Sequence, residues 1–214
     1  MTRGWMFALA GVLAITAGCS PFQASGPAPR EYLLSAPTDG VNESIFRGLP
    51  EALALARPAV PAGLDGTRIR IRRPDQRLDY IADVRWAEPL PDLLAHVQRD
   101  LLRASGRSVS RAGTESANAD TLLELRMERF HPVYSDDLGA PPRLEVGLAL
   151  TLVDASTGRV IARGRAESAT RVQTNRTGTI VSGLQHLLQQ TLLDGLSQIA
   201  RTADRRRSAV PRAG

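Results

Sequence analysis

The chain has 214 residues, of which 43% are hydrophobic and 23% are charged, a composition typical of a globular protein. Its 27 basic residues are all arginines, and they outnumber the 22 acidic residues to give a net charge of +5. Between Cys19 and Ala200, however, the numbers of arginines and acidic residues are equal, so the body has no excess of basic charge to follow a phosphate backbone. The sequence therefore excludes nucleic acid as a partner.

The N-terminus has the pattern of an export signal. A single charge at Arg3 precedes an apolar stretch over residues 5–15, which is too short to span a bilayer. Ala17 and Gly18 then precede Cys19, the only cysteine, as in a bacterial lipobox, although Thr16 stands where Leu is usual. The sequence predicts removal of residues 1–18 and attachment of diacylglycerol and a fatty acyl chain to Cys19. The alternative is an ordinary signal cut nearby, which would leave Cys19 as a free thiol.

The composition divides the rest of the chain into three segments. Residues 19–30 are rich in Pro, Gly, Ala and Ser and are predicted to be a flexible tether to a membrane. Residues 31–203 are predicted to form one domain. Residues 204–214 are predicted to be a basic disordered tail, whose arginines either remain solvated or contact anionic lipid headgroups.

Within the domain, the first half of the chain mixes short strands with one clear helix. Strands are predicted over 31–36, 67–72 and 78–85, and an uncertain region contains a predicted short helix over 49–56. From Leu90 to Ala104, apolar residues recur at helical spacing, with Pro91 in the first turn and Gly106 after the end. This pattern predicts an amphipathic helix.

The second half contains the strongest alternation. Strands are predicted over 107–111 and 121–130, followed by a pair formed by 144–152 and a return strand near 160–171. Because residues that face each other in an antiparallel pair lie on one side of the sheet, Leu152 is expected opposite Ala162, with Gly158 at positive φ in the loop.

The inner face of the return strand is made of small residues, so a bulky element should pack against it. The expected element is a helix over 179–202. Its apolar stripe comprises Ile180, Leu184, Leu187, Leu188, Leu192, Leu196 and Ile199. The predicted fold is α+β with two layers, a mainly antiparallel sheet carrying two amphipathic helices on one face.

Motifs of catalytic or metal sites are absent from the sequence. It has no Gly-x-Ser-x-Gly elbow, no phosphate-binding glycine loop and no pair of histidines at metal-ligand spacing. We therefore expect no enzyme, no metal and no cofactor beyond the lipid on Cys19. The alternative of an unfamiliar periplasmic hydrolase would require titratable residues that converge only in the folded chain.

Three stretches together resemble one family. Tyr32 to Leu34 form a Tyr-Leu-Leu strand soon after the cysteine, and Val60 to Asp65 read Val-Pro-Ala-x-Leu-Asp ahead of a strand. The most specific stretch, Trp-Ala-Glu-Pro-Leu, runs from Trp86 to Leu90 before the amphipathic helix. These features resemble the ABC-type transport auxiliary lipoproteins, over about residues 31–203. The chain departs from the family pattern at Gly63, where Tyr is common.

The resemblance implies a periplasmic lipoprotein that works with an ABC transporter and an MCE-type substrate-binding protein to move lipids across the Gram-negative envelope. It also implies a homo-oligomer, and it brings no catalytic residues. Trp86, Glu88 and Pro89 are the candidate residues either for a partner interface or for fixing the start of the helix. Ser20 lacks the Asp that retains many lipoproteins at the inner membrane, which favours the outer membrane. The alternative function is an outer-membrane or cell-wall assembly lipoprotein without a transporter.

Overall fold

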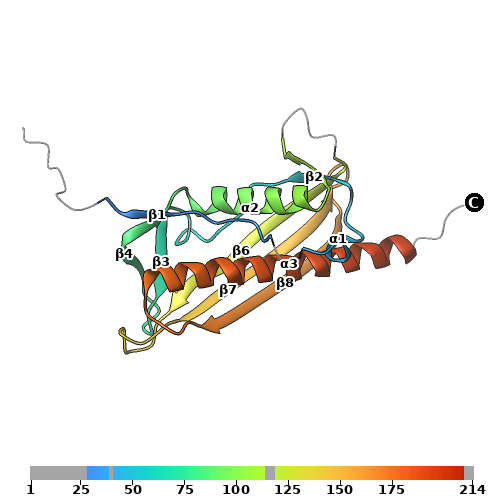
Figure 1. The fold of residues 1–214 in the computed structure, drawn as a ribbon. Helices are drawn as coiled ribbons and strands as arrows, with labels where there is room; N and C mark the ends of the chain where they lie inside the picture. The colour runs from blue at the N-terminus through green and yellow to red at the C-terminus, as the bar shows by residue number, and fades with distance from the viewer. Residues whose placement is uncertain (1–27, 39–40, 114–118, 210–214) are drawn as a thin grey trace, which may run out of the picture.

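The computed structural model describes residues 28–38, 41–113 and 119–209, which form one large sheet and three helices (Figure 1). The predicted signal segment, Cys19, most of the predicted tether and residues 210–214 lie outside the described residues. In chain order the elements are β1 (Arg30–Tyr32), α1 (Glu43–Phe46), β2 (Ala52–Leu55), β3 (Arg68–Arg72), β4 (Leu78–Trp86), α2 (Leu90–Ala104), β5 (Ser108–Arg111), β6 (Thr121–Val133), β7 (Arg143–Asp154), β8 (Val160–Arg171) and α3 (Thr177–Ala209).

The sheet is mostly antiparallel, as the sequence predicted. Its long strands β6, β7 and β8 pair antiparallel, and β3 pairs antiparallel with β4. Parallel pairs extend this array, because β1 adds to β4 while β2 lies between β5 and β6. Among the described strands, β5 pairs only with β2, so it forms one end of the sheet.

The β7–β8 hairpin confirms the predicted register. Leu152 lies opposite Ala162, and Gly158 adopts a φ of 70° in the loop. The Asp154 carboxylate accepts hydrogen bonds from the backbone N–H of Ser156 and Thr157, at 3.1 and 2.9 Å, and from the Ser156 hydroxyl at 2.7 Å. These bonds lower the pKa of Asp154 to about 2, since they favour the charged carboxylate.

Helix α3 packs on the inner face of β7 and β8, as the small residues of β8 predicted. All seven residues of its apolar stripe are buried. At Gly164 on β8, an added Cβ would lie 2.9 Å from Ile199 Cγ2 and 3.1 Å from the carbonyl oxygen of Gly195. The small residues of β8 therefore allow close approach of the helix backbone.

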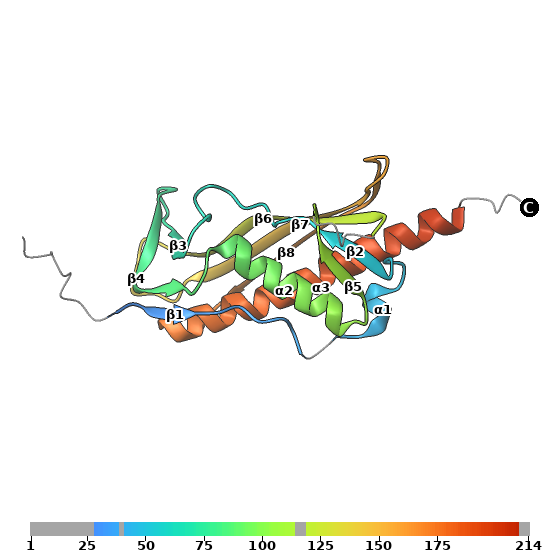
Figure 2. The same cartoon turned by 90° about the horizontal axis from the view of Figure 1, so that it is seen from above.

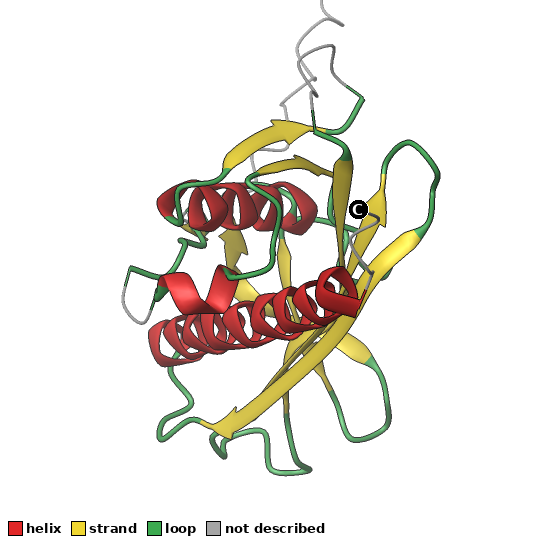
Figure 3. Ribbon diagram, turned by 90° about the vertical axis from the view of Figure 1, so that its right-hand side faces the viewer, coloured by secondary structure: helices red, strands yellow, loops and turns green. Residues whose placement is uncertain are grey.

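Helix α2 has the bounds that the sequence predicted, and its apolar residues Leu90, Leu93, Leu94, Val97, Leu101 and Leu102 are all buried. Figures 1 and 3 show α2 and α3 on the same side of strands β6, β7 and β8. A third helix, the short α1, was not predicted; it begins after Asn42, whose side chain accepts a hydrogen bond from Ser44 N.

The helix predicted over 49–56 is wrong. Its second half is strand β2, which is inserted between β5 and β6 and is mostly buried. Because both faces of such a strand are covered, its sequence Ala-Leu-Ala-Leu shows no apolar–polar alternation, and its residues also favour helices. Tertiary pairing therefore overrides the local helix preference.

Both ends of the predicted domain also differ from expectation. Strand β1 begins at Arg30, inside the predicted tether, and ends at Tyr32, because its partner β4 ends at Trp86. Helix α3 continues to Ala209, although a disordered tail was predicted from residue 204. Arg206 and Arg207 explain part of this extension, since they donate hydrogen bonds to the carbonyl oxygens of Val160 and Gly48 at 3.0 and 3.1 Å.

Candidate functional site

A groove of about 580 Å³ lies between helix α2 and strands β2 and β5 at the end of the sheet. Its apolar lining comes from Leu55, Ala56, Ala95, Val109 and Ala112. Its charged lining comes from Arg57, Asp92, Arg99, Arg103 and Arg111. The groove therefore combines an apolar surface with guanidinium groups. This combination suits ligands that have both an anionic group and an apolar part.

Basic residues predominate in the lining of the groove. Among the described residues, four arginines and one aspartate line it. Asp92 is engaged with Arg57, whose Nε and Nη2 donate to the two carboxylate oxygens at 3.2 and 3.3 Å. This pairing raises the pKa of Arg57. In contrast, Arg99 and Arg103 have no carboxylate within 4 Å among the described residues, so their charge is not locally neutralised.

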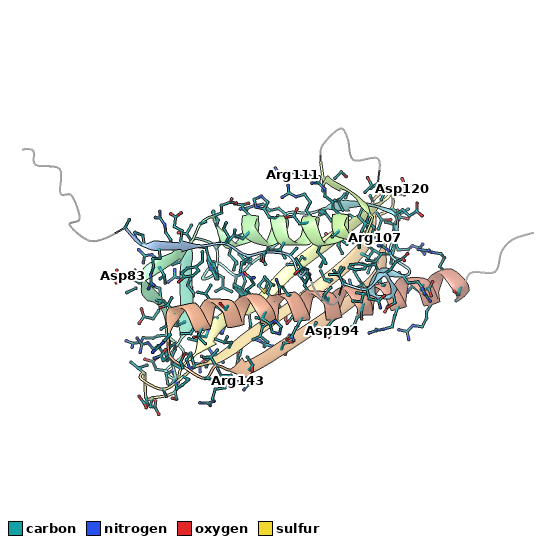
Figure 4. All side chains as sticks on the ribbon, viewed as in Figure 1. Asp83, Arg107, Arg111, Asp120, Arg143 and Asp194 are labelled. Atoms are coloured by element: carbon teal, nitrogen blue, oxygen red, sulfur yellow. The ribbon has the colours of Figure 1, made fainter. Side chains whose placement is uncertain are left out.

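Strand β5 forms one wall of the groove along its whole length. Five consecutive residues, 108–112, line the groove, so the wall is the edge of the strand rather than one of its faces. Figure 4 shows Arg111 on this strand, above the C-terminal half of α2. The hydroxyl of Ser110 is buried and has no hydrogen-bond partner in the described part of the chain. The β5 wall therefore contributes the Ser110 hydroxyl to the groove, in addition to the arginine side chains.

The Trp-Ala-Glu-Pro-Leu segment lies between β4 and α2 and is fixed by three backbone hydrogen bonds. Trp86 N donates to Thr67 O at 2.7 Å, Ala87 N to Tyr32 O at 2.8 Å, and Leu90 N to Gly66 O at 3.1 Å. The Trp86 side chain is only 2% exposed. Its ring packs on Phe130 with centroids 5.7 Å apart. The ring thus lies in the core and presents little surface to a partner.

The other two candidate residues of this segment lie nearer the surface. Pro89 is exposed and is the N-cap residue of α2. Glu88 lies 3.6 Å from His96 Nδ1, and both side chains are nearly half exposed. None of Trp86, Glu88 and Pro89 lines the groove. A role for these residues in partner contact stays a prediction.

His131 is the one buried histidine in the described part of the chain, with 7% of its surface exposed. It lies on β6 opposite Glu145, and neither ring nitrogen has a hydrogen-bond partner among the described residues. Burial lowers the pKa of His131, and the charge of nearby Arg72 lowers it further. His131 is therefore a neutral core residue at neutral pH.

Sequence reasoning missed the groove. Its residues come from three segments that are far apart in the chain: the end of β2, the polar face of α2, and β5. A pattern that could have indicated the groove is the pair Arg99 and Arg103, because their spacing of four residues places both on one face of α2. Within the described residues, no cluster of His, Cys, Asp and Glu could hold a metal ion. None of the described helices combines the length and apolar character needed to cross a membrane.

Solved structures with a similar fold include a protein of the DUF330 family from Xanthomonas campestris. It is 22% identical to this chain with a TM-score of 0.63, and the match covers 84% of this chain and 97% of that one. A second structure, of an uncharacterized protein, is 18% identical with a TM-score of 0.53 over 85% of this chain and 99% of that one. PelC from Paraburkholderia phytofirmans, solved as a dodecamer, is 19% identical with a TM-score of 0.44, covering 81% of this chain and 94% of that one. A search of curated proteins gives no match.

A family model matches most of the chain as well. The model for the ABC-type transport auxiliary lipoprotein component matches residues 32–194, which include strands β2 to β8, helix α2 and the Trp-Ala-Glu-Pro-Leu segment. The resemblance inferred from the three sequence stretches is thereby confirmed. The chain belongs to the family of ABC-type transport auxiliary lipoproteins.

Proposed function

We propose that this protein is a lipid-anchored, non-catalytic component of an ABC transport system in the Gram-negative envelope. It would act with a transporter ATPase and an MCE-type substrate-binding protein to move lipids or other hydrophobic substrates. The observation that carries this proposal is the family match over residues 32–194. The export signal and the cysteine at residue 19 support it, because they would place the body in the periplasm.

Anchoring would depend on the Cys19 sulfur, modified with diacylglycerol and a fatty acyl chain. Strand β1 begins at Arg30, so the chain between the anchor and the folded body is about ten residues long. An extended segment of that length spans roughly 35 Å, which lets the body lie close to the bilayer without touching it. The residue after the cysteine is Ser20, which favours the outer membrane as the site of anchoring.

Metabolic labelling with a fatty-acid analogue tests the anchor. Wild-type protein should incorporate the analogue and fractionate with membranes, whereas Cys19→Ser should lose both properties. Equal labelling of the two proteins would refute acylation at this residue. Separating inner and outer membranes on a density gradient then tests the outer-membrane assignment.

Affinity purification of the full acylated protein from gently solubilised envelopes tests the transporter role. We expect an ATPase and an MCE-type subunit to co-purify. A clean preparation that lacks both would favour a structural lipoprotein of the outer membrane or cell wall. Light scattering on the same preparation tests the homo-oligomer that we also propose.

A further inference from the structure

The groove between α2, β2 and β5 has a chemical character that the proposed transport role leaves unassigned. Arg99 and Arg103 lie on its helix wall without a carboxylate within 4 Å among the described residues, while Val109 and Leu55 contribute apolar surface. We propose that the groove binds the phosphate headgroup of an amphiphile. Arg99 and Arg103 would hold the phosphate oxygens, and the apolar lining would hold the first carbons of the attached chain. This inference deepens the proposed function, since it names the class of ligand.

The arrangement of charges favours a phosphate over a cationic or neutral headgroup. A guanidinium presents a planar fork of N–H donors that matches two oxygens of a phosphate. Arg99 and Arg103 are one helical turn apart, so their guanidinium groups can reach one ligand from the same side. Asp92, the one carboxylate among the described residues that line the groove, is already bonded to Arg57. An incoming anion therefore meets two cations that have no acidic partner within 4 Å in the described part of the chain.

The apolar lining favours an amphiphile over free phosphate. The volume of about 580 Å³ is within the range of small-ligand sites, which hold far more than one phosphate group. Five apolar residues line the groove together with the arginines. Inorganic phosphate would leave this apolar surface exposed to water, whereas a short hydrocarbon segment would cover it.

The groove also lies away from the predicted anchor. Figures 1 and 2 show β1, where the described chain begins, at one end of the molecule and β2 and β5 at the opposite end. A headgroup in the groove would therefore come from a lipid presented at the far end of the body, rather than from the bilayer next to the anchor. This placement fits transfer between the protein and a partner.

Calorimetric titration of the full acylated protein in nonionic detergent tests the inference. The ligands are dihexanoyl phosphatidate, dihexanoyl phosphatidylcholine and glycerol phosphate, each used as a soluble monomer. We expect phosphatidate to bind more tightly than the other two. The double variant Arg99→Gln/Arg103→Gln should weaken phosphatidate binding by about tenfold or more, because two charge-assisted contacts are lost.

The matched control is Arg163→Gln/Arg171→Gln, which removes the same charge from exposed positions on β8, outside the groove. This control should bind phosphatidate as the wild type does. Val109→Thr keeps the side-chain shape but replaces a methyl group by a hydroxyl. It should therefore weaken the binding of phosphatidate and leave the binding of glycerol phosphate unchanged. Thermal unfolding of each variant verifies that the fold is intact.

Three results would overturn the inference: no binding of phosphatidate, an equal loss in the groove variant and the β8 control, or equal affinity for phosphatidate and glycerol phosphate. The last result would indicate a site for free phosphate. The co-purification experiment separates this inference from the proposed function. If the transporter subunits co-purify but phosphatidate does not bind, only the groove assignment fails; if phosphatidate binds but no subunits co-purify, only the transporter role fails.

Discussion

Replacing Gly164 by Ala should destabilise the contact between helix α3 and strand β8. The added methyl carbon would lie 2.9 Å from Ile199 Cγ2, 3.1 Å from Gly195 O and 3.2 Å from Gln198 Cβ. Non-bonded carbons prefer roughly 3.5–4.0 Å, so the helix or the Ile199 side chain must move. Overpacking of this kind costs about 1–3 kcal/mol, and alanine recovers about 0.5–1 kcal/mol by restricting the unfolded chain. The net loss should therefore be up to about 2.5 kcal/mol of unfolding free energy.

Urea unfolding followed by circular dichroism measures this change as a lower midpoint at constant slope. Gly178→Ala is the matched control, because it makes the same substitution in the first turn of α3, where an added Cβ meets nothing within 4 Å. This control should be as stable as the wild type or more stable by up to about 1 kcal/mol. In an Ile199→Ala background, the penalty of Gly164→Ala should shrink, because the closest contact is gone. A Gly164→Ala protein at least as stable as the wild type would refute the close packing.

Three further substitutions test other parts of the structure. Trp86→Ala should lower the unfolding free energy by about 3–5 kcal/mol in urea titrations, because it empties a core site against Phe130. Burial lowers the folded pKa of His131, so the unfolded chain takes up its proton first as the pH falls below about 6.5. The wild type should thus lose more stability than His131→Gln between pH 7 and about pH 5, and parallel losses would contradict this. Asp154 should titrate at about 2 by NMR, and Ser156→Ala should raise that pKa because it removes the strongest hydrogen bond to the carboxylate. Since the folded pKa of Asp154 is depressed, its stabilising effect is present above about pH 4 and is lost as the pH falls towards 2.

Elements whose residues carry their own periodicity could be predicted from the sequence. Helix α2 has the predicted bounds because its apolar residues, its first-turn proline and Gly106 all lie within one short stretch. The β7–β8 register followed from alternation on both sides of a short loop. In each case the information is local, so no knowledge of the rest of the fold was needed.

Features that depend on distant partners could not be predicted in this way. Strand β2 is extended because it pairs with β5 and β6, which follow it by more than 50 and 60 residues, and nothing in Ala-Leu-Ala-Leu specifies those partners. The end of α3 depends on two distant carbonyl oxygens. Arg206 donates a hydrogen bond to the carbonyl oxygen of Val160 on β8, and Arg207 donates one to the carbonyl oxygen of Gly48 in the loop after α1. The groove also depends on segments that are distant in the chain, because Arg99 becomes part of a site only when β2 and β5 lie beside α2.

The parallel pairing of β1 with β4 determines how the folded body would respond to force on its N-terminus. Arg30, Glu31 and Tyr32 lie beside the last three residues of β4, and Glu31 also accepts a hydrogen bond from Arg85 Nε at 3.0 Å. Tension along the N-terminal segment pulls β1 parallel to its neighbour, so the interstrand bonds are loaded together in shear instead of opening one by one. Force on the N-terminus would therefore pass from β1 to the end of β4 at Trp86 before β1 could peel away from the sheet.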